Sequence, residues 1–210
     1  MHLELTGLGK RFNRHWIFRK LDFTFEAGKK YAITGPNGSG KSTLLQVIAG
    51  TAQASEGKIS SRVTGFDGET TVAPEDFFRH IGLAAPYLEL IEELTLTEFL
   101  DFHFSLKPAL EGFNTALVIE YIGLTSARNR AIRLFSSGMK QRVKLAQAFF
   151  AKSPLLLLDE PTTNFDVQGI LLYHKMVAEL AKDRTLLICS NEANEIDFCE
   201  KRLLITDYKS

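Results

Sequence analysis

The chain has 210 residues, and its 25 Lys and Arg residues are balanced by 25 Asp and Glu residues. A formal net charge of zero argues against a protein whose main role is to coat nucleic acid, because binding to the phosphate backbone requires a basic surface. With two cysteines, no apolar run long enough to span a membrane and no signal peptide, the sequence predicts a cytoplasmic protein without a disulfide framework or a zinc-ligand set.

The first third of the chain is predicted to be rich in strands. Leu3–Thr6 and Leu21–Glu26 alternate apolar and polar residues, as half-buried strands do. Lys30–Thr34 is a short strand that leads into a glycine-rich segment, and Gly57–Gly65 is a further strand bounded by glycines. Between the last two, Ser42–Ala49 has apolar residues at helical spacing and is predicted to be a helix.

The middle of the chain changes to helical patterns. Thr97–Ser105 and Thr115–Ile122 each carry apolar residues at helical spacing. Ser136–Phe150 is a stronger candidate, because one of the two serines at its start can cap the helix and apolar residues recur along it. We interpret residues from about 75 to 150 as an inserted helical subdomain.

The last third of the chain alternates strands and helices. Leu155–Leu158 is a wholly apolar run of leucines, which fits a strand buried on both faces of a parallel sheet. Ile170–Ala181 is predicted to be a helix, and Thr185–Ser190 and Lys201–Thr206 are predicted to be strands. Strands that alternate with helices indicate an α/β sheet.

The glycine-rich segment carries the clearest chemical pattern. Its sequence, GPNGSGKST over Gly35–Thr43, fits the phosphate-binding pattern G-x-x-x-x-G-K-[ST]. Glycines let the backbone curl around an anion, and the helix that begins there contributes unpaired N–H groups. We expect Lys41 to bridge the β- and γ-phosphates of ATP and Ser42 to bind Mg²⁺. The nucleotide-binding residues predicted in this loop are Gly35, Asn37, Gly38, Ser39, Gly40, Lys41, Ser42 and Thr43.

An acidic pair, Asp159 and Glu160, follows the leucine run. Ligands of α/β sheets bind at the carboxyl ends of the parallel strands, so we assign Asp159 to Mg²⁺, either directly or through water. Glu160 is expected to orient or deprotonate the attacking water. Taken alone, the pair fits a solvated turn equally well, but beside a phosphate loop it indicates a magnesium-dependent ATPase.

In their order and spacing, these motifs resemble those of the ATP-binding subunits of ATP-binding-cassette (ABC) transporters, across essentially the whole chain. The segment Phe135–Met139 (FSSGM) looks like the family signature, usually LSGGQ, with Ser137 in place of a glycine and Met139 in place of the glutamine. The resemblance implies that two subunits pack head-to-tail and that Ser136, Ser137 and Gly138 contact the γ-phosphate bound by the other subunit. The small residues at this helix start leave the backbone N–H groups accessible to phosphate, and the alternative is a plain serine-capped helix.

Two further site residues are implied by the resemblance. Asp166, in the sequence TNFD, matches the aspartate of the family's D-loop, which would couple the two sites of a dimer. Phe12 falls where the family places an aromatic residue that stacks on adenine, and Trp16 is the competing candidate.

Two positions depart from the family pattern. Pro86 stands where the family has a glutamine that contacts the metal and the water. Proline offers no polar side chain, so that place would be empty, filled by water or taken by a neighbour such as Tyr87. Asn191 stands where the family has a histidine that contacts the γ-phosphate. Asparagine donates a hydrogen bond but carries no charge. We therefore predict slow hydrolysis that rests on Glu160, with Asn191 as the hydrogen-bond donor to the γ-phosphate.

The resemblance also implies a fold. It is an α/β fold of the P-loop NTPase class and the ABC type, with a mostly parallel core sheet, an N-terminal antiparallel β region and an inserted helical subdomain. Residues 1–210 would form one ATPase domain. Its α/β core would comprise residues 1–74 and 151–210, and its helical subdomain would run from about 75 to 150 and include the signature segment.

The leading functional hypothesis is an ATPase subunit that uses ATP and Mg²⁺ to energise transport by a separate membrane-spanning permease. Its expected partners are a second ATPase subunit, most simply an identical chain, and the permease, with no nucleic acid. It would lie at the inner face of the cell membrane, and its compact size favours an exporter. The alternatives are a soluble ABC-type ATPase, such as an assembly factor, and a slow-hydrolysing switch that uses ATP as a dimerising ligand.

Overall fold

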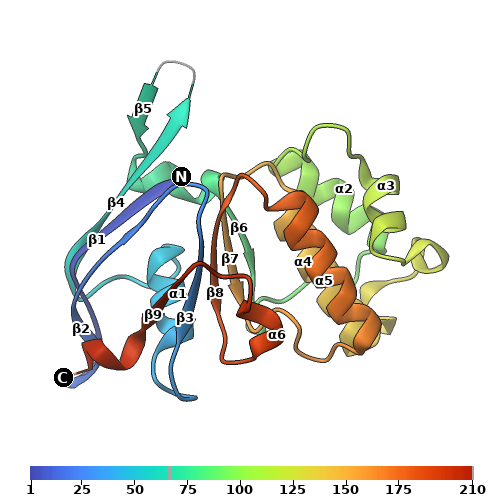
Figure 1. Cartoon of the computed structure of the whole chain (residues 1–210). Coiled ribbons are helices and arrows are strands. Elements are labelled where there is room, and N and C mark those ends of the chain that lie inside the picture. Colours follow the sequence, from blue (N-terminus) through green and yellow to red (C-terminus); the bar gives the residue numbers. More distant parts are fainter. Residues whose placement is uncertain (66–67, 210) are drawn as a thin grey trace. The chain divides into compact units, whose positions relative to one another are not determined.

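The computed structural model describes residues 1–65 and 68–209 and divides into two compact units (Figure 1). The first unit comprises Met1–Ile81, Pro154–Asp159 and Asp183–Ser210, and the second comprises Gly82–Ser153 and Glu160–Lys182. Each unit is therefore assembled from segments that are far apart in the sequence.

The helical unit differs in extent from the subdomain predicted from sequence. It begins at Gly82 rather than near residue 75, and it also takes in residues 160–182. The physical reason is that helix α5 (Val167–Leu180) packs against helix α4 (Ser137–Phe150). The sequence prediction assigned α5 to the α/β core because α5 is the first helix after a core strand. The order of elements along the chain does not reveal that α5 packs against α4.

The first unit contains an antiparallel sheet with the strand order β2-β1-β4-β5. Its strands are β1 (His2–Phe12), β2 (His15–Phe25), β4 (Glu56–Gly65) and β5 (Gly68–Thr71). The antiparallel β region near the N-terminus is therefore confirmed. β1 is longer than predicted because its pairing with β2 shifts register between Leu5 and Leu8, where Gly7 has a φ of 56° and interrupts the alternation of apolar residues.

The second sheet has the strand order β6-β7-β8-β3-β9, and the last four of these strands belong to the first unit. Their pairings, β7 with β8, β8 with β3 and β3 with β9, are all parallel. Every residue of β7 and of β8 is buried, which confirms the prediction of strands covered on both faces. The bounds are β3 (Lys30–Thr34), β6 (Ile81–Ala84), β7 (Leu155–Asp159), β8 (Thr185–Cys189) and β9 (Lys201–Leu204).

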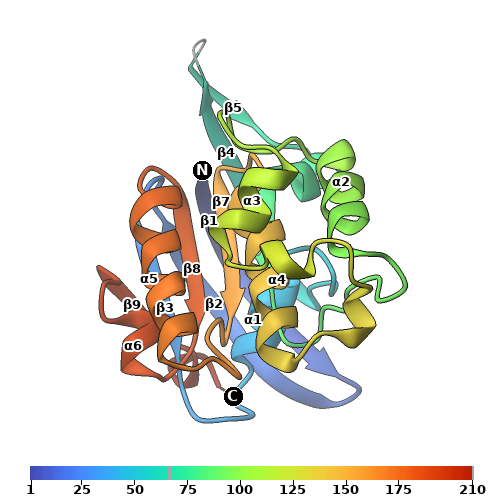
Figure 2. The same ribbon diagram turned by 90° about the vertical axis from the view of Figure 1, so that its right-hand side faces the viewer.

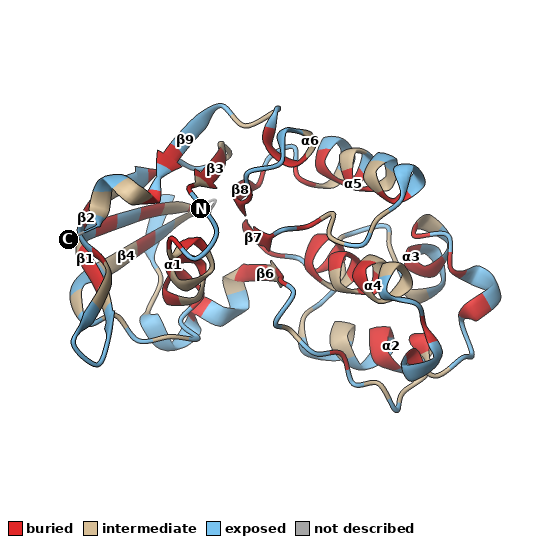
Figure 3. Ribbon diagram, turned by 90° about the horizontal axis from the view of Figure 1, so that it is seen from below, coloured by how far each residue is buried: buried red, intermediate tan, exposed pale blue. Residues whose placement is uncertain are grey.

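Helix α1 (Lys41–Ile48) lies between the two sheets of the first unit, where it contacts β1 on one side and β7 and β8 on the other (Figure 3). Leu44, Leu45, Val47 and Ile48 are buried in these contacts. Burial on both sides fixes the start of α1, and with it the glycine-rich loop, relative to the strand ends. Short helical turns complete the unit: a 3-10 helix over Pro74–His80, α6 (Ala193–Ile196) and a 3-10 helix over Ile205–Tyr208.

The second unit is built from helices, and Figure 2 shows α3 and α4 within it. α2 contacts both α3 and α4, while α4 contacts α5. Each of these helices begins at a polar residue whose side chain accepts a backbone N–H, as stable N-caps do. The helices and their capping residues are α2 (Leu96–Leu106) with Thr95, α3 (Thr115–Tyr121) with Asn114, α4 with Ser136 and α5 with Asp166. Across residues 1–65 and 68–209, no helix has both the length and the apolar character needed to cross a membrane.

Candidate functional site

The predicted phosphate loop connects the end of β3 to the start of α1, as the sequence pattern requires. Gly35, Gly38 and Gly40 have φ values of 147°, 74° and 106°, a region that favours glycine. Space is also restricted, because a Cβ at Gly40 would lie 2.4 Å from the Ile17 side chain and one at Gly35 would lie 2.7 Å from Ile205. Both the backbone angles and the packing therefore require glycine at Gly35 and Gly40.

The loop forms a cradle of the kind that binds an anion. No side chain caps the start of α1 in the described structure, so the first N–H groups of the helix stay available to a ligand. Ser39 is 1% exposed, and its Oγ has no hydrogen-bond partner among the described residues. A buried hydroxyl without a partner is costly in the absence of a ligand, which fits a phosphate group at this position. Asn37 and Gly38 lie exposed at the tip of the loop.

Lys41 is the first residue of α1 and is only 6% exposed. Its Nζ donates to the carbonyl oxygen of Gly35 at 2.7 Å and to that of Pro36 at 3.3 Å. The ammonium group is therefore held over the loop, where its charge attracts phosphate. Ser42 and Thr43 follow on α1, half-buried.

Asp159 occupies the last position of β7 and is 2% exposed. It pairs in register with Cys189 of β8, whose Sγ donates to the carbonyl oxygen of Lys41 at 3.4 Å. Cys189 in turn pairs with Ile33 near the end of β3. Asp159 and the phosphate loop therefore lie at the same edge of the sheet. A carboxylate and the hydroxyl of Ser42 are oxygen ligands of the type that Mg²⁺ prefers, so the residues fit a bound Mg²⁺.

Glu160 follows Asp159 directly and begins the second unit's last segment. It is exposed and has a φ of 43°, a value that non-glycine residues rarely adopt. Its carbonyl oxygen accepts a hydrogen bond from the N–H of Thr163 at 3.2 Å, which closes a tight turn. Unusual backbone angles of this kind recur at functional sites.

Asn191 lies two residues beyond β8, and its side chain contacts the phosphate loop. Its Oδ1 accepts a hydrogen bond from the N–H of Gly35 at 3.1 Å, and its Nδ2 donates to the carbonyl oxygen of the same residue at 2.8 Å. The predicted contact of Asn191 with a γ-phosphate stays a prediction. The contact with Gly35 was not anticipated from the sequence, because it depends on how β8 and β3 are placed side by side.

The two aromatic candidates for adenine stacking lie on the β1–β2 hairpin. Phe12 is 52% exposed, with the Nζ of Lys10 4.7 Å from its ring centre. Trp16 is half-buried, and the guanidinium groups of Arg11 and Arg19 lie 5.4 Å and 4.5 Å from its ring. Phe12 is therefore the more open of the two rings.

The signature segment begins helix α4 in the second unit. Ser136 is the N-cap residue, and its Oγ accepts a hydrogen bond from the N–H of Met139 at 3.3 Å. Ser136 and Ser137 are exposed, and a Cβ added to Gly138 would lie 3.2 Å from the carbonyl oxygen of Asn164. The small residues therefore let the loop after β7 pass close to the start of the helix.

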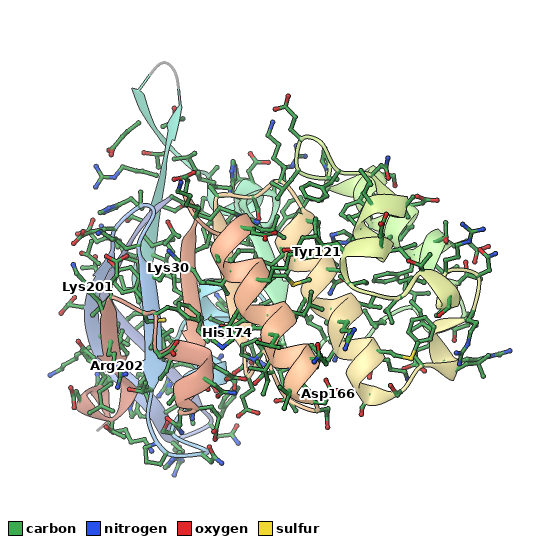
Figure 4. The ribbon with its side chains drawn as sticks, turned by 45° about the vertical axis from the view of Figure 1, so that its right-hand side comes forward. Lys30, Tyr121, Asp166, His174, Lys201 and Arg202 are labelled. Atoms are coloured by element: carbon green, nitrogen blue, oxygen red, sulfur yellow. The ribbon has the colours of Figure 1, made fainter. Side chains whose placement is uncertain are left out.

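Asp166 caps α5 in the same unit, where its Oδ1 accepts from the N–H of Gly169 at 2.8 Å (Figure 4). The structure brings this predicted D-loop residue together with the predicted signature residues. Asp166 and the signature residues line the same open pocket of about 410 Å³. Its lining residues are Leu124, Ser136, Ser137, Gly138, Met139, Arg142, Asn164, Phe165 and Asp166. Exposed serines and helix N–H groups at such a pocket are suited to contact an anionic group.

Three polar residues of α4 hold neighbouring loops of the second unit and were not predicted as site residues from the sequence. Gln141 is buried and donates to the carbonyl oxygen of Pro161 at 2.8 Å, and Arg142 donates to that of Ile122 at 3.1 Å. Lys144 donates to the carbonyl oxygen of Pro86 at 2.9 Å, and partial burial lowers the pKa of its ammonium group. The available signal in the sequence was that these polar residues interrupt the apolar residues of the predicted helix.

Comparisons with known proteins identify the family to which the chain is similar. The family model described as ABC transporter matches residues 18–163. An uncharacterized ABC transporter ATP-binding protein, YybJ of Bacillus subtilis, is 30% identical over 195 residues, which cover 92% of this chain and 87% of that protein. The daunorubicin/doxorubicin resistance ATP-binding protein DrrA of Streptomyces peucetius is 31% identical, and the match covers 98% of this chain but only 62% of that protein.

Solved structures give the same answer for the fold. The dimeric structure of MJ0796, a bacterial ABC transporter cassette, matches with a TM-score of 0.80 and 23% identity, over 97% of this chain and 94% of that one. A structure described as the ATP binding subunit of an ABC transporter matches with a TM-score of 0.79 and 27% identity, over 98% and 87% of the two chains. The chain thus belongs to the ABC transporter family, in which it is an ATP-binding ATPase cassette of the P-loop type.

Proposed function

We propose that the chain hydrolyses ATP to energise transport by a separate membrane-spanning permease. The observation that carries the proposal is the presence of two distinct half-sites. One is the glycine cradle at the start of α1, which is suited to hold the phosphates. The other is the pocket at the start of α4, which offers helix N–H groups and serines to an anion.

In the first half-site, Lys41 neutralises the β- and γ-phosphates while Ser42 and Asp159 hold Mg²⁺. Bound Mg²⁺ offsets charge on the phosphates. Glu160 orients the attacking water and accepts its proton. The ring of Phe12, which is more exposed than that of Trp16, supplies a stacking surface for adenine.

The second half-site serves a partner subunit. Ser136, Ser137 and Gly138 contact the γ-phosphate bound by the other copy. Asp166 lines the same pocket and couples the two sites of the dimer. The relation is symmetric, so two copies packed head-to-tail make two complete sites. One of the similar structures is described as dimeric, which supports pairing of two cassettes.

The permease is proposed from the relatives and from one exposed surface. Similar proteins include the daunorubicin/doxorubicin resistance ATP-binding protein DrrA and the Nod factor export ATP-binding protein I. The segment after β6 exposes Tyr87 (39%) and Ile91 (43%) beside the exposed carboxylates of Glu89 and Glu93. Such a surface fits a helix of the permease with apolar and basic residues, which would hold the chain at the inner face of the membrane.

Trapping the closed state tests the proposal. Glu160→Gln keeps the shape of the side chain but removes the base, so it should bind MgATP, lose most ATPase activity and elute as a dimer in size-exclusion chromatography. Glu111→Gln, a substitution of an exposed loop residue, is the matched control and should behave as the wild type. An unchanged turnover rate in Glu160→Gln, or a monomer at saturating MgATP, would contradict the proposal.

A slow nucleotide-dependent dimerisation switch is the second candidate. It is favoured by Pro86, which has no polar side chain, and by the engagement of Asn191 with Gly35. The turnover rate of the wild-type chain distinguishes the two. A switch would dimerise with MgATP while hydrolysing it no faster than Glu160→Gln does.

A further inference from the structure

The side chain of Asn191 makes a paired contact with one residue of the phosphate loop. Its oxygen accepts from the N–H of Gly35 at 3.1 Å, and its nitrogen donates to the carbonyl oxygen of Gly35 at 2.8 Å. Both backbone groups of Gly35 are therefore bonded to a single side chain. The side-chain amide thus takes the place of the backbone groups that bond both polar groups of a residue within a sheet.

The contact continues the strand pairing beyond the end of β3. β3 and β8 pair in parallel up to Ile33 and Cys189, and the N–H of Ser190 donates to the carbonyl oxygen of Ile33 at 3.2 Å. At the next step the loop turns away, since Gly35 has a φ of 147°. There the Asn191 side chain takes over from the backbone as the partner, so the first residue of the loop stays attached to β8.

The backbone of Gly35 is closely packed and hydrogen-bonded at the start of the phosphate loop. A Cβ there would lie 2.7 Å from Ile205 and 2.8 Å from the Oγ of Ser39, so the chain is tightly enclosed. Lys41 also donates to the carbonyl oxygen of Gly35, at 2.7 Å. Without the bond from Lys41, the Nδ2 of Asn191 would still donate to this carbonyl oxygen.

We propose that Asn191 is a positioning residue that fixes the phosphate loop for ADP and ATP alike, rather than a group that detects the γ-phosphate. The inference rests on the proposed role of Gly35–Thr43 as the phosphate loop. An amide presents its oxygen and nitrogen in the same direction, so it can meet the N–H and C=O of one residue. The two nitrogens of an imidazole point apart, so a histidine at this position does not reproduce the pair.

The test compares nucleotide affinities of the full chain carrying Asn191→Leu or Asn191→His. ADP lacks the γ-phosphate, so a group that detects this phosphate has no effect on ADP. We expect both variants to weaken binding of MgADP and MgATP by the same factor, about tenfold for two lost hydrogen bonds. At saturating MgATP, kcat should stay within about twofold of the wild-type value while KM rises.

The control is Asn194→Leu, an asparagine on α6 three residues further along the chain, which should leave both affinities unchanged. Thermal unfolding without nucleotide checks that each variant is folded. An unchanged Kd for MgADP in Asn191→Leu, or a fall in kcat without a change in KM, would overturn the inference. Failure of the wild-type chain to bind either nucleotide, or wild-type affinity in Lys41→Ala, would instead contradict the assignment of the phosphate loop.

Discussion

At the scale of single residues, the phosphate loop was predictable because its chemistry and its backbone geometry demand the same residue types. The sequence pattern requires glycines near Gly35 and Gly40, and the structure shows that packing against Ile205 and Ile17 excludes a side chain at both. The contact of Asn191 with Gly35 was not predictable. It joins residues 156 positions apart and depends on the pairing of β3 with β8.

Phe12 gives a prediction at the same scale. Phe12→Ala should weaken MgATP binding by about tenfold, because stacking of a base on an aromatic ring contributes roughly 1–3 kcal/mol. Inorganic triphosphate has no base, so its affinity should not change. Titrations of Phe12→Ala and of Trp16→Ala with both ligands make the comparison. A larger loss of MgATP affinity in Trp16→Ala than in Phe12→Ala would assign adenine stacking to Trp16 instead.

At the scale of elements, most helices and buried strands followed from periodicity. β3 matches its predicted bounds, and α4 begins at a serine cap as predicted. The exceptions have local causes. The predicted first strand was too short, because the register shift near Gly7 interrupts the apolar alternation of β1. The predicted last strand was too long, because β9 ends at Leu204 and a 3-10 turn begins at Ile205. A bulge and a turn of this type leave only a weak pattern in the sequence.

The cap of α5 gives a prediction for an element. Asp166→Ala removes the side-chain oxygen that accepts from the N–H of Gly169, and it should lower the free energy of unfolding by about 1 kcal/mol. Asp166→Ser keeps a capping oxygen, so it should retain most of that stability. Chemical denaturation of the three proteins measures the effect. Equal stability of Asp166→Ala and the wild type would show that this cap contributes nothing.

At the scale of the whole molecule, the sequence predicted an α/β core with an inserted helical part, and the family comparison agrees with that fold. The extent of the helical unit could not be predicted from the sequence. Residues 160–182 join it through the packing of α5 on α4, a contact between segments separated by the strand β7 in the chain. Hydrophobic periodicity identifies α5 as amphipathic but does not say which partner covers its apolar face.

The central proposal is that each complete site takes its phosphate loop from one copy and its signature segment from another. Mixing two defective variants tests this arrangement directly. Lys41→Ala removes the ammonium group of the first half-site, and Gly138→Asp places a bulky negative charge in the second. Each variant alone should be inactive, but a mixed dimer contains one intact pair of half-sites.

The matched control mixes Lys41→Ala with Asp159→Asn. Both of these changes damage the phosphate-loop side, so no mixed dimer regains a complete site. ATPase activity should therefore rise only when Lys41→Ala is mixed with Gly138→Asp. In an equal mixture we predict recovery to about a quarter of the wild-type rate, because half of the dimers are mixed and each has one working site. Activity no higher than that of the separate variants would contradict the head-to-tail site.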